Sequence, residues 1–483
     1  MKVLPFARYD AGRASPYHQT PPTATSADSE FANSNRLLRD WARHLADNSA
    51  IVNAILSSRV SNAVGPGLSY EPLTRDRKGN LLTELNDAIK RVHERWSRSA
   101  DVTGELSRPE LERQAWRCWD LDGESFARRV NLRFTKDSRE LPYHVQLMKS
   151  EWVPANLTGV YDGTRLVHGI QKDDWGRPQF FYIEPNVTDI TNTLGVFLKP
   201  SSMLKLPADQ VWHLKRTQQP GQTRGVTLLH AIIFRVHDIA EFEQSHRLAA
   251  RASADLWASI NRDIGFDPSL DSTRGEETAN GKTKNTWEFE HLQMIDGLAP
   301  GESVNFHSPQ HPNQNAVDFV REELRHIASA CDVGFSQVAQ VFDSSYAAQR
   351  LEVVDTWRKV ERDRSKFISD FARPALYEQV VEAARLTGQL PARAMRKLDP
   401  ETFLDARIDG PTMPVIDPVK DRQAFALDQG NGWDSRPGII RRMGKRPADI
   451  DAEIKSDDLS DMGKPEPVKQ NDQQDQNQED EEA

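Results

Sequence analysis

The sequence has only two cysteines, Cys118 and Cys331, among its 483 residues. Such sparse and widely separated thiols exclude a disulfide-stapled secreted scaffold and fit a reducing compartment. They also exclude a structural zinc site of the usual kind, because no cluster of histidines supplies the further ligands that zinc needs. We therefore expect no metal and no other cofactor.

Long hydrophobic runs are missing as well. No stretch approaches the ~18 consecutive apolar residues of a membrane span. The first residues, MKVLPFARYDAGRASPYHQ, lack both the apolar core and the cleavage site of a signal peptide. We expect no association with a membrane.

The sequence also lacks an excess of positive charge. The chain carries 62 Lys and Arg against 72 Asp and Glu, a formal net charge of −10. Because phosphate neutralisation supplies most of the affinity of DNA-binding proteins, tight DNA binding by the whole surface is excluded. Weak and transient contact with DNA stays possible. The 37% of hydrophobic residues are enough for two or three globular domains.

Helical and strand-like patterns both occur, which predicts the α+β class. A helix is expected from near Asn33 or Ser34 to Gly65, and others over 81–96 and 107–123. Short strand-like runs separated by turns follow up to residue 216, including one at 196–200. Later helices are expected over 225–260, over 315–334, and in a long run to Leu386 that only Pro374 would bend.

The stretch GEETANGKTKN, from Gly275 to Asn285, resembles a nucleotide-binding loop. Such a loop has four residues between its first Gly and the Gly-Lys pair, whereas this one has five, EETAN. The polar run DPSLDSTR precedes it where a buried strand is required, and a strand-like run follows where a helix is required. We interpret it as a solvated loop and expect no enzyme activity.

Two other groups of polar residues suggest a metal site at first sight. Asp120, Asp122 and Glu124 alternate in DLDGES, but the remaining ligands of a calcium loop are absent and Asp122-Gly123 is a common turn pair. The histidines at 213, 230, 237 and 246 do not have the spacing of a metal pair. A turn between a helix and a strand, and structural histidines, are the expected outcomes.

Several stretches together resemble the lambda-like family of phage portal proteins. They are NRLLRDWARHLADNSAIVNAILSSRVSNAVGPGLSYEP, PGQTRGVTLLHAI, PGESVNFHSPQHPNQNAVDFVREELRHIASACDVGFSQVAQVF, MPVIDPVKDRQAF and GWDSRPGIIRRMGKRPADIDAEI. Their order and spacing carry the resemblance over most of residues 33–455. The sequence departs from the family pattern at SSYAAQR, before the last long helix, and at Val415.

The resemblance implies a portal fold with an α/β wing, a two-helix stem, a clip insert, a long helix and a helical crown, assembled into a ring. The implied parts are an arm at 1–32, a wing at 33–224, a stem helix at 225–260, a clip at 261–313, a second stem helix at 314–334, a tunnel loop at 335–349, a long helix with a return through the wing at 350–416, a crown at 417–465 and an acidic tail at 466–483. The arm, rich in Pro, Ser and Thr, and the tail, almost free of apolar groups, are expected to be mobile and disordered.

The implied function is that of a twelve-subunit ring at one capsid vertex, through which double-stranded DNA enters and leaves. The implied partners are further copies of the chain, the terminase large subunit, the head-tail connector or adaptor protein, and the major capsid and scaffold proteins. Such a protein is assembled in the host cytoplasm and stays in the virion. The alternatives are a terminase-like nucleotide hydrolase and an adaptor that forms no ring.

The candidate DNA-facing residues follow from the mapping of FSQVAQVFDSSYAAQ onto the tunnel loop. Its uncharged polar side chains could contact phosphates without trapping them. Phe335, Val338, Val341 and Phe342 are expected to anchor the loop on neighbouring helices, and Asp343 is its one acid. The candidates are Gln337, Gln340, Ser344, Ser345 and Gln349.

Overall fold

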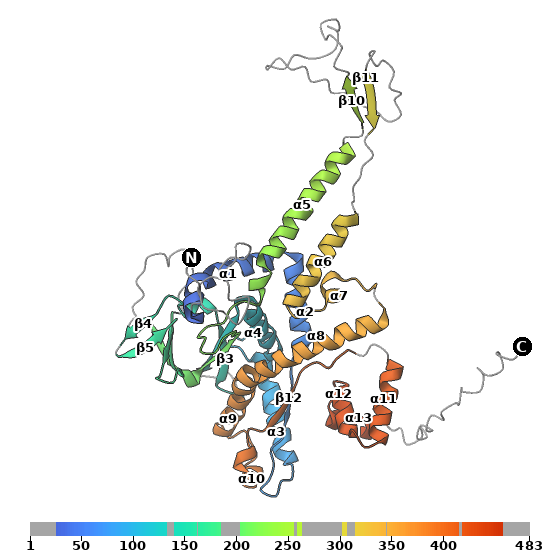
Figure 1. Cartoon of the computed structure of the whole chain (residues 1–483). Helices are drawn as coiled ribbons and strands as arrows, with labels where there is room; N and C mark the ends of the chain where they lie inside the picture. The colour runs from blue at the N-terminus through green and yellow to red at the C-terminus, as the bar shows by residue number, and fades with distance from the viewer. Residues whose placement is uncertain are drawn as a thin grey trace, which may run out of the picture.

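The computed structural model describes residues 26–132, 140–161, 163–184, 203–255, 258–262, 302–306, 314–343, 345–414 and 418–456. Helices and small antiparallel sheets form a broad body from which two helices, α5 and α6, project side by side (Figure 1). The mixture of elements confirms the α+β class. No helix in these ranges is both long and apolar enough to cross a bilayer.

The first described residues form two helices, α1 (Ala27–Asn48) and α2 (Ala50–Ala63), where the sequence predicted one. Ser26 caps α1 and accepts a hydrogen bond from a backbone N–H of the first turn. The predicted start near Asn33 or Ser34 is therefore wrong, and the last residues of the stretch expected to be an arm are helical. Ser49 is extended between the helices and caps α2, so the single long helix is also corrected.

The main core lies between the two helices that follow α2 in the chain and the C-terminal part of a long helix, which is described below. The helices α3 (Thr83–Trp96) and α4 (Arg108–Asp122) confirm the predictions for 81–96 and 107–123. Ser107 and Glu110 form a capping box at the start of α4. Trp116 is fully buried, and its ring centroid lies 5.1 Å from that of Phe367 on the long helix.

Three small antiparallel sheets complete the body. One has the strand order β3-β2-β9, another the order β4-β5-β6-β7-β8, and the third pairs β1 with β12. The strands are β1 (Ser69–Pro72), β2 (Glu124–Asn131), β3 (Tyr143–Met148), β4 (Gly159–Tyr161), β5 (Thr164–Val167), β6 (Ile170–Lys172), β7 (Pro178–Ile183), β8 (Leu204–Pro207), β9 (Val211–Lys215) and β12 (Ala406–Asp409). The strand expected at 196–200 lies outside the described residues.

The projecting pair consists of α5 (Ile233–Asp255) and α6 (Gln314–Ala330). A short 3-10 helix, Leu228–Ala231, precedes α5, so the predicted helix 225–260 is shorter at both ends. Between the pair, β10 (Ala258–Arg262) and β11 (Glu302–Phe306) form an antiparallel ribbon. Most of the expected clip, including GEETANGKTKN, lies outside the described residues.

The long C-terminal helix is continuous through its proline. It consists of α8 (Tyr346–Phe367), a π-helical stretch (Ile368–Glu378) and α9 (Gln379–Leu386). Pro374 lies inside the π-helical stretch, where wider winding accommodates a residue that donates no backbone hydrogen bond. After it come α10 (Ala392–Met395) and β12, which returns the chain to the body.

Three short helices follow where a crown is expected, namely α11 (Pro418–Gly430), α12 (Arg436–Arg442) and α13 (Pro447–Ser456). They bury little apolar surface, since α11 has no buried residue. Exposed or half-buried ion pairs connect them to the body, such as Lys90 with Asp449 at 2.9 Å and Glu71 with Arg441 at 3.2 Å. The acidic tail lies outside the described residues.

Candidate functional site

The candidate tunnel loop crosses from the base of α6 to α8. It begins with the short helix α7 (Phe335–Ala339) and continues in irregular chain to the start of α8. Glu352 of α8 accepts hydrogen bonds from the backbone N–H of Ser336 at 2.8 Å and from its hydroxyl at 3.0 Å. This carboxylate ties the start of the loop to the helix that leaves it.

The structure describes four of the five candidate residues; Ser344 is outside the described ranges. Gln337 accepts a hydrogen bond from Asn62 of α2 at 3.1 Å. Gln340 is exposed, has a positive φ of 54°, and donates to the carbonyl of Gln337 at 2.9 Å. Gln349 donates to the carbonyl of Phe342 at 3.0 Å.

Ser345 has a different part in the loop, because it caps α8 by accepting from the backbone N–H of Ala348 at 3.3 Å. The four described candidates therefore lie along one segment and hold its shape, largely through bonds to backbone groups. Their contact with DNA stays a prediction.

The expected apolar side of the loop is only half present in the single chain. Phe335 and Val338 pack into a core cluster formed by α1, α2, α5 and α6. Val341 is 38% exposed and Phe342 63% exposed, so the expectation that they pack on neighbouring helices is wrong within one chain. Asp343 forms an ion pair with Arg321 of α6 at 2.6 Å, which offsets the single negative charge of the loop.

A buried arginine, Arg59, contacts the chain at the end of α6, shortly before the loop begins. Its guanidinium contacts Asp120 of α4 at 2.9 Å and Asp363 of α8 at 2.7 Å. It also donates to the carbonyl of Cys331, at the end of α6, at 3.1 Å. Arg216 contacts the same two carboxylates at 2.7 and 3.6 Å. This cluster joins α2, α4, α6 and α8 at one point.

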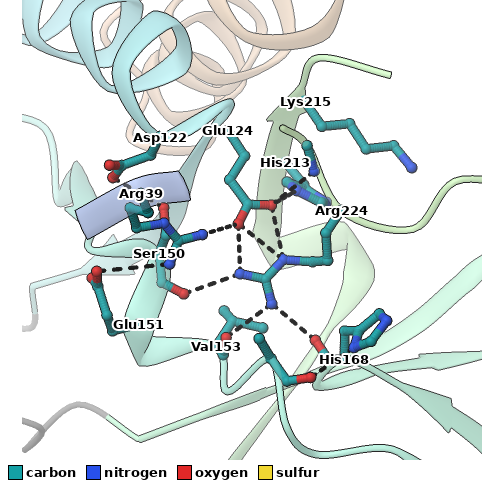
Figure 2. A network of polar contacts seen from close by, with 12 residues as sticks. Arg39, Asp122, Glu124, Ser150, Glu151, Val153, His168, His213, Lys215 and Arg224 are labelled. Carbon is teal, nitrogen blue, oxygen red and sulfur yellow. Dashed lines mark hydrogen bonds and ion pairs between the residues drawn. The ribbon is translucent and has the colours of Figure 1, made fainter. Parts of the chain in front are cut away.

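A second buried network holds the entrance to α5 and is shown in Figure 2. Arg224 donates to both carboxylate oxygens of Glu124, the shortest contact being 2.6 Å, and both side chains are fully buried. Arg224 also donates to the carbonyls of Val153 and His168, both at 2.9 Å. All three nitrogens of this guanidinium therefore donate hydrogen bonds, as a buried charge requires.

Further groups complete the network around the Glu124 carboxylate. Arg39 of α1 donates to it at 3.1 Å, and His213 of β9 lies 3.0 Å away with its ring stacked on Phe126. Burial would raise the pKa of Glu124, but the charge of Arg224 outweighs it and holds that pKa well below its usual range. The network thus fixes α1, strands β2 and β9, and the segment before α5 relative to one another.

Burial also lowers the pKa of His213 to about 4, from its ordinary value of 6.5. Between these values the unfolded chain binds a proton at this imidazole that the folded chain does not, so folding stability falls as the pH falls. Burial likewise lowers the pKa of His93 to about 3. We predict that each histidine costs about 2 kcal/mol of stability at pH 5 relative to pH 7.5.

Urea unfolding at the two pH values measures this loss. His213→Gln retains a hydrogen-bonding group beside Glu124. It should reduce the difference in the free energy of unfolding between the two pH values by about half. An equal pH dependence in the variant and the parent would show that His213 is not a source of the effect.

The sequence pattern DLDGES is confirmed as a turn between α4 and β2. Gly123 has a φ of 82°, and a Cβ there would lie 2.1 Å from the carbonyl carbon of Val226, so only glycine fits. What the sequence did not reveal is that each acid of the pattern pairs with an arginine. Asp120 and Glu124 pair with the buried Arg59 and Arg224, and Asp122 contacts the half-buried Arg43 at 2.8 Å. Within the described ranges, no group of three or more His, Cys, Asp or Glu side chains could hold a metal ion.

Comparison with known proteins gives concordant matches. The family described as "Phage portal protein, lambda family" matches residues 14–364. A "Probable portal protein" of Halomonas phage phiHAP-1 is 25% identical over 461 residues, covering 90% of this chain and 82% of that protein. A "Portal protein" of Escherichia phage N15 is 22% identical over 171 residues, 32% of each chain. A solved structure, "Neck of empty GTA particle computed with C6 symmetry", has a TM-score of 0.45 at 13% identity over 86% of this chain and 94% of that chain.

The family match runs from the segment before α1, through the body and the projecting helices, to the Arg59 cluster on α8. It therefore contains both buried arginine networks and the candidate tunnel loop. Because this match extends over well more than half of the sequence, the chain belongs to the lambda family of phage portal proteins.

Proposed function

We propose that this portal protein forms a ring, of twelve subunits by family resemblance, that conducts double-stranded DNA into and out of the capsid. The observation that carries the proposal is the exposed apolar surface of the stem helices. Phe234 of α5 and Val317 and Phe319 of α6 are all at least half exposed in the single chain. Neighbouring copies arranged around an axis would cover such residues, which a lone soluble chain would not favour exposing.

The parts of the ring follow from the same proposal. The projecting pair α5 and α6 forms the stem, the β10–β11 ribbon leads into the clip, and α11 to α13 form the crown. The clip would dock the terminase large subunit during packaging and the head-tail connector afterwards. The body would contact the major capsid and scaffold proteins at the vertex during assembly in the host cytoplasm.

The energy for packaging would come from another protein. The loop GEETANGKTKN has the wrong spacing for a nucleotide-binding loop, and the buried carboxylates of Asp120 and Glu124 are paired with arginines. Family membership favours a conduit over a terminase-like enzyme or a ringless adaptor.

Imaging of the purified protein by negative-stain microscopy tests the proposal. Rings with a central hole are expected. A double change, Val317→Asp with Phe319→Asp, places charge on the stem surface and should abolish rings while the chain stays folded. Monodisperse single chains of the unchanged protein, at concentrations typical of assembly, would refute the ring.

A charge added to the candidate tunnel loop should impede DNA movement. Gln340 is exposed, so Gln340→Lys should leave folding and rings intact. It adds one cation per subunit toward the phosphates, and DNA should adhere more tightly, lowering the yield of packaged genomes severalfold. Gln429→Lys makes the same change at an exposed position of α11 and serves as the control. Equal packaging by both variants would show that Gln340 does not face the DNA.

A further inference from the structure

A cleft of 710 Å³ lies between α8, the end of β12 with the chain that follows it, and helices α11 and α12. We call it the arginine cleft, because arginines from α8, β12 and α12 line it. They are Arg350, Arg358, Arg364, Arg407, Arg441 and Arg442. In a chain whose net charge is −10, such a concentration of guanidinium groups needs an explanation.

The acids of the arginine cleft do not neutralise all of these charges. Asp421 contacts Arg350 at 3.2 Å, and Asp409 contacts Arg407 at 2.7 Å. The other two acids of the lining are also engaged: Asp434 lies 3.3 Å from Arg442, and Glu361 accepts a hydrogen bond from the Trp357 indole at 3.0 Å. Arg441 finds its partner outside the lining, Glu71 at 3.2 Å.

Two guanidinium groups of the lining remain without a carboxylate. Arg358 is exposed, and the described part of the chain places no acid within ion-pair distance of it. Arg364 is only 8% exposed and likewise has no carboxylate within ion-pair distance in the described ranges; Glu361 and Asp409 act on its charge from farther away. A buried cation without a directly paired carboxylate is costly, so this arrangement favours an anion from outside the chain.

Arg364 is also held in place before any ligand arrives. Its Nε donates to the carbonyl of Ala63 at 3.0 Å and one terminal nitrogen donates to that of Asn62 at 2.7 Å, at the end of α2. The guanidinium carbon lies 5.1 Å from the centre of the Trp357 ring. These contacts leave the other terminal nitrogen unbonded within the described residues and fix the cation at the wall of the cleft.

We propose that the arginine cleft binds the phosphodiester backbone of DNA, with Arg358 and Arg364 as the cations that have no ion-pair partner in the described ranges. Guanidinium groups suit this ligand because they donate in pairs to two phosphate oxygens and stay charged at all physiological pH values. The position of the cleft fits as well. Arg350, its first arginine on α8, directly follows the expected tunnel loop at 335–349. This step rests on the proposed function, in which DNA passes the tunnel loop.

The salt dependence of DNA binding tests the site. The assembled protein is titrated with a short fluorescent duplex at several salt concentrations. Arg358→Gln should reduce the slope of log affinity against log salt by about 0.9 for each phosphate that the variant no longer neutralises. Arg362→Gln is the matched control, since it removes the same charge from an exposed position of α8 that faces Asp332 and Asp363 instead. Equal slopes for the two variants would overturn the proposal.

A second variant tests the geometry. Arg364→Lys keeps the charge but lacks the paired donors, so we expect weaker binding with a nearly unchanged slope. Competition identifies the ligand class: pyrophosphate should displace the duplex more effectively than polyglutamate of equal charge. Equal displacement by polyglutamate would show a general anion site and contradict the assignment to phosphodiesters.

Images of the same preparation separate this proposal from the function on which it rests. If no rings form but Arg358→Gln still changes the slope relative to Arg362→Gln, the conduit fails and the DNA site stands. If rings form and the slopes are equal, the conduit stands and the DNA site fails.

Discussion

Replacing Glu124 by alanine should lower the free energy of unfolding by about 3–5 kcal/mol. The substitution leaves Arg224 fully buried without a carboxylate and removes from Arg39 its 3.1 Å contact, while His213 loses its hydrogen-bond partner. Because the whole stability of a domain is about 5–15 kcal/mol, such a loss brings the part of the body around this network close to unfolding. Urea unfolding followed by tryptophan fluorescence measures the change.

An exposed ion pair provides the control for this prediction. Glu382 and Arg385 on α9 are both more than a third exposed, and Glu382→Ala should change stability by at most about 1 kcal/mol. Should Glu124→Ala be insoluble, Glu124→Gln retains hydrogen-bonding atoms and gives a smaller loss in the same direction. If Glu124→Ala and Glu382→Ala have the same unfolding midpoint, the buried network does not contribute the predicted stability.

The parts of the fold that the sequence predicted well are those with a strong local pattern. The helix at 81–96 was predicted because its apolar residues recur at helical spacing, and the structure buries that face in α3. The continuous helix through Pro374 was likewise predicted from the absence of other breakers. Local signals of this kind need no knowledge of distant contacts.

The sequence was misleading where several residues could cap the same helix equally well. Asn33 and Ser34 are good caps, but Ser26 starts α1 earlier, and Ser49 divides the expected helix without any Gly or Pro. The buried networks were missed for another reason. Glu124 and Arg224 are 100 residues apart in the chain, and no periodic pattern reports that they meet.

The segment expected to be the tunnel loop was also only partly predictable. Its borders follow from helix signals on both sides, but the exposure of Val341 and Phe342 could not be read from their apolar character. In a ring, these side chains would face another subunit, which the sequence of one chain does not describe. The polar candidates were identified by type, whereas their bonds to the backbone depend on the turn at Gln340.

The second prediction of large effect concerns Arg59, which holds the end of α6 directly before this loop. Arg59→Met should destabilise the chain by about 3 kcal/mol, because Asp120 and Asp363 lose the buried cation between them and keep only Arg216 in common, with the exposed Arg362 still beside Asp363. It should also have a local effect, since the carbonyl of Cys331 loses its donor at the end of α6. We therefore expect faster hydrogen exchange at the amides of α7, beyond the change that lower global stability causes.

Arg108→Met separates the local effect from the global one. Arg108 is a second arginine with little exposure, paired with the fully buried Glu112 at the far end of the core from the loop. Its replacement should cost a comparable free energy of unfolding while leaving the exchange of α7 in proportion to the rest of the body. If Arg59→Met and Arg108→Met accelerate exchange in α7 equally at matched stability, the buried cluster holds the fold but not the loop. A selective loss of protection in Arg59→Met would instead show that the loop facing the proposed channel takes its position from a charge at the junction of α2, α4, α6 and α8.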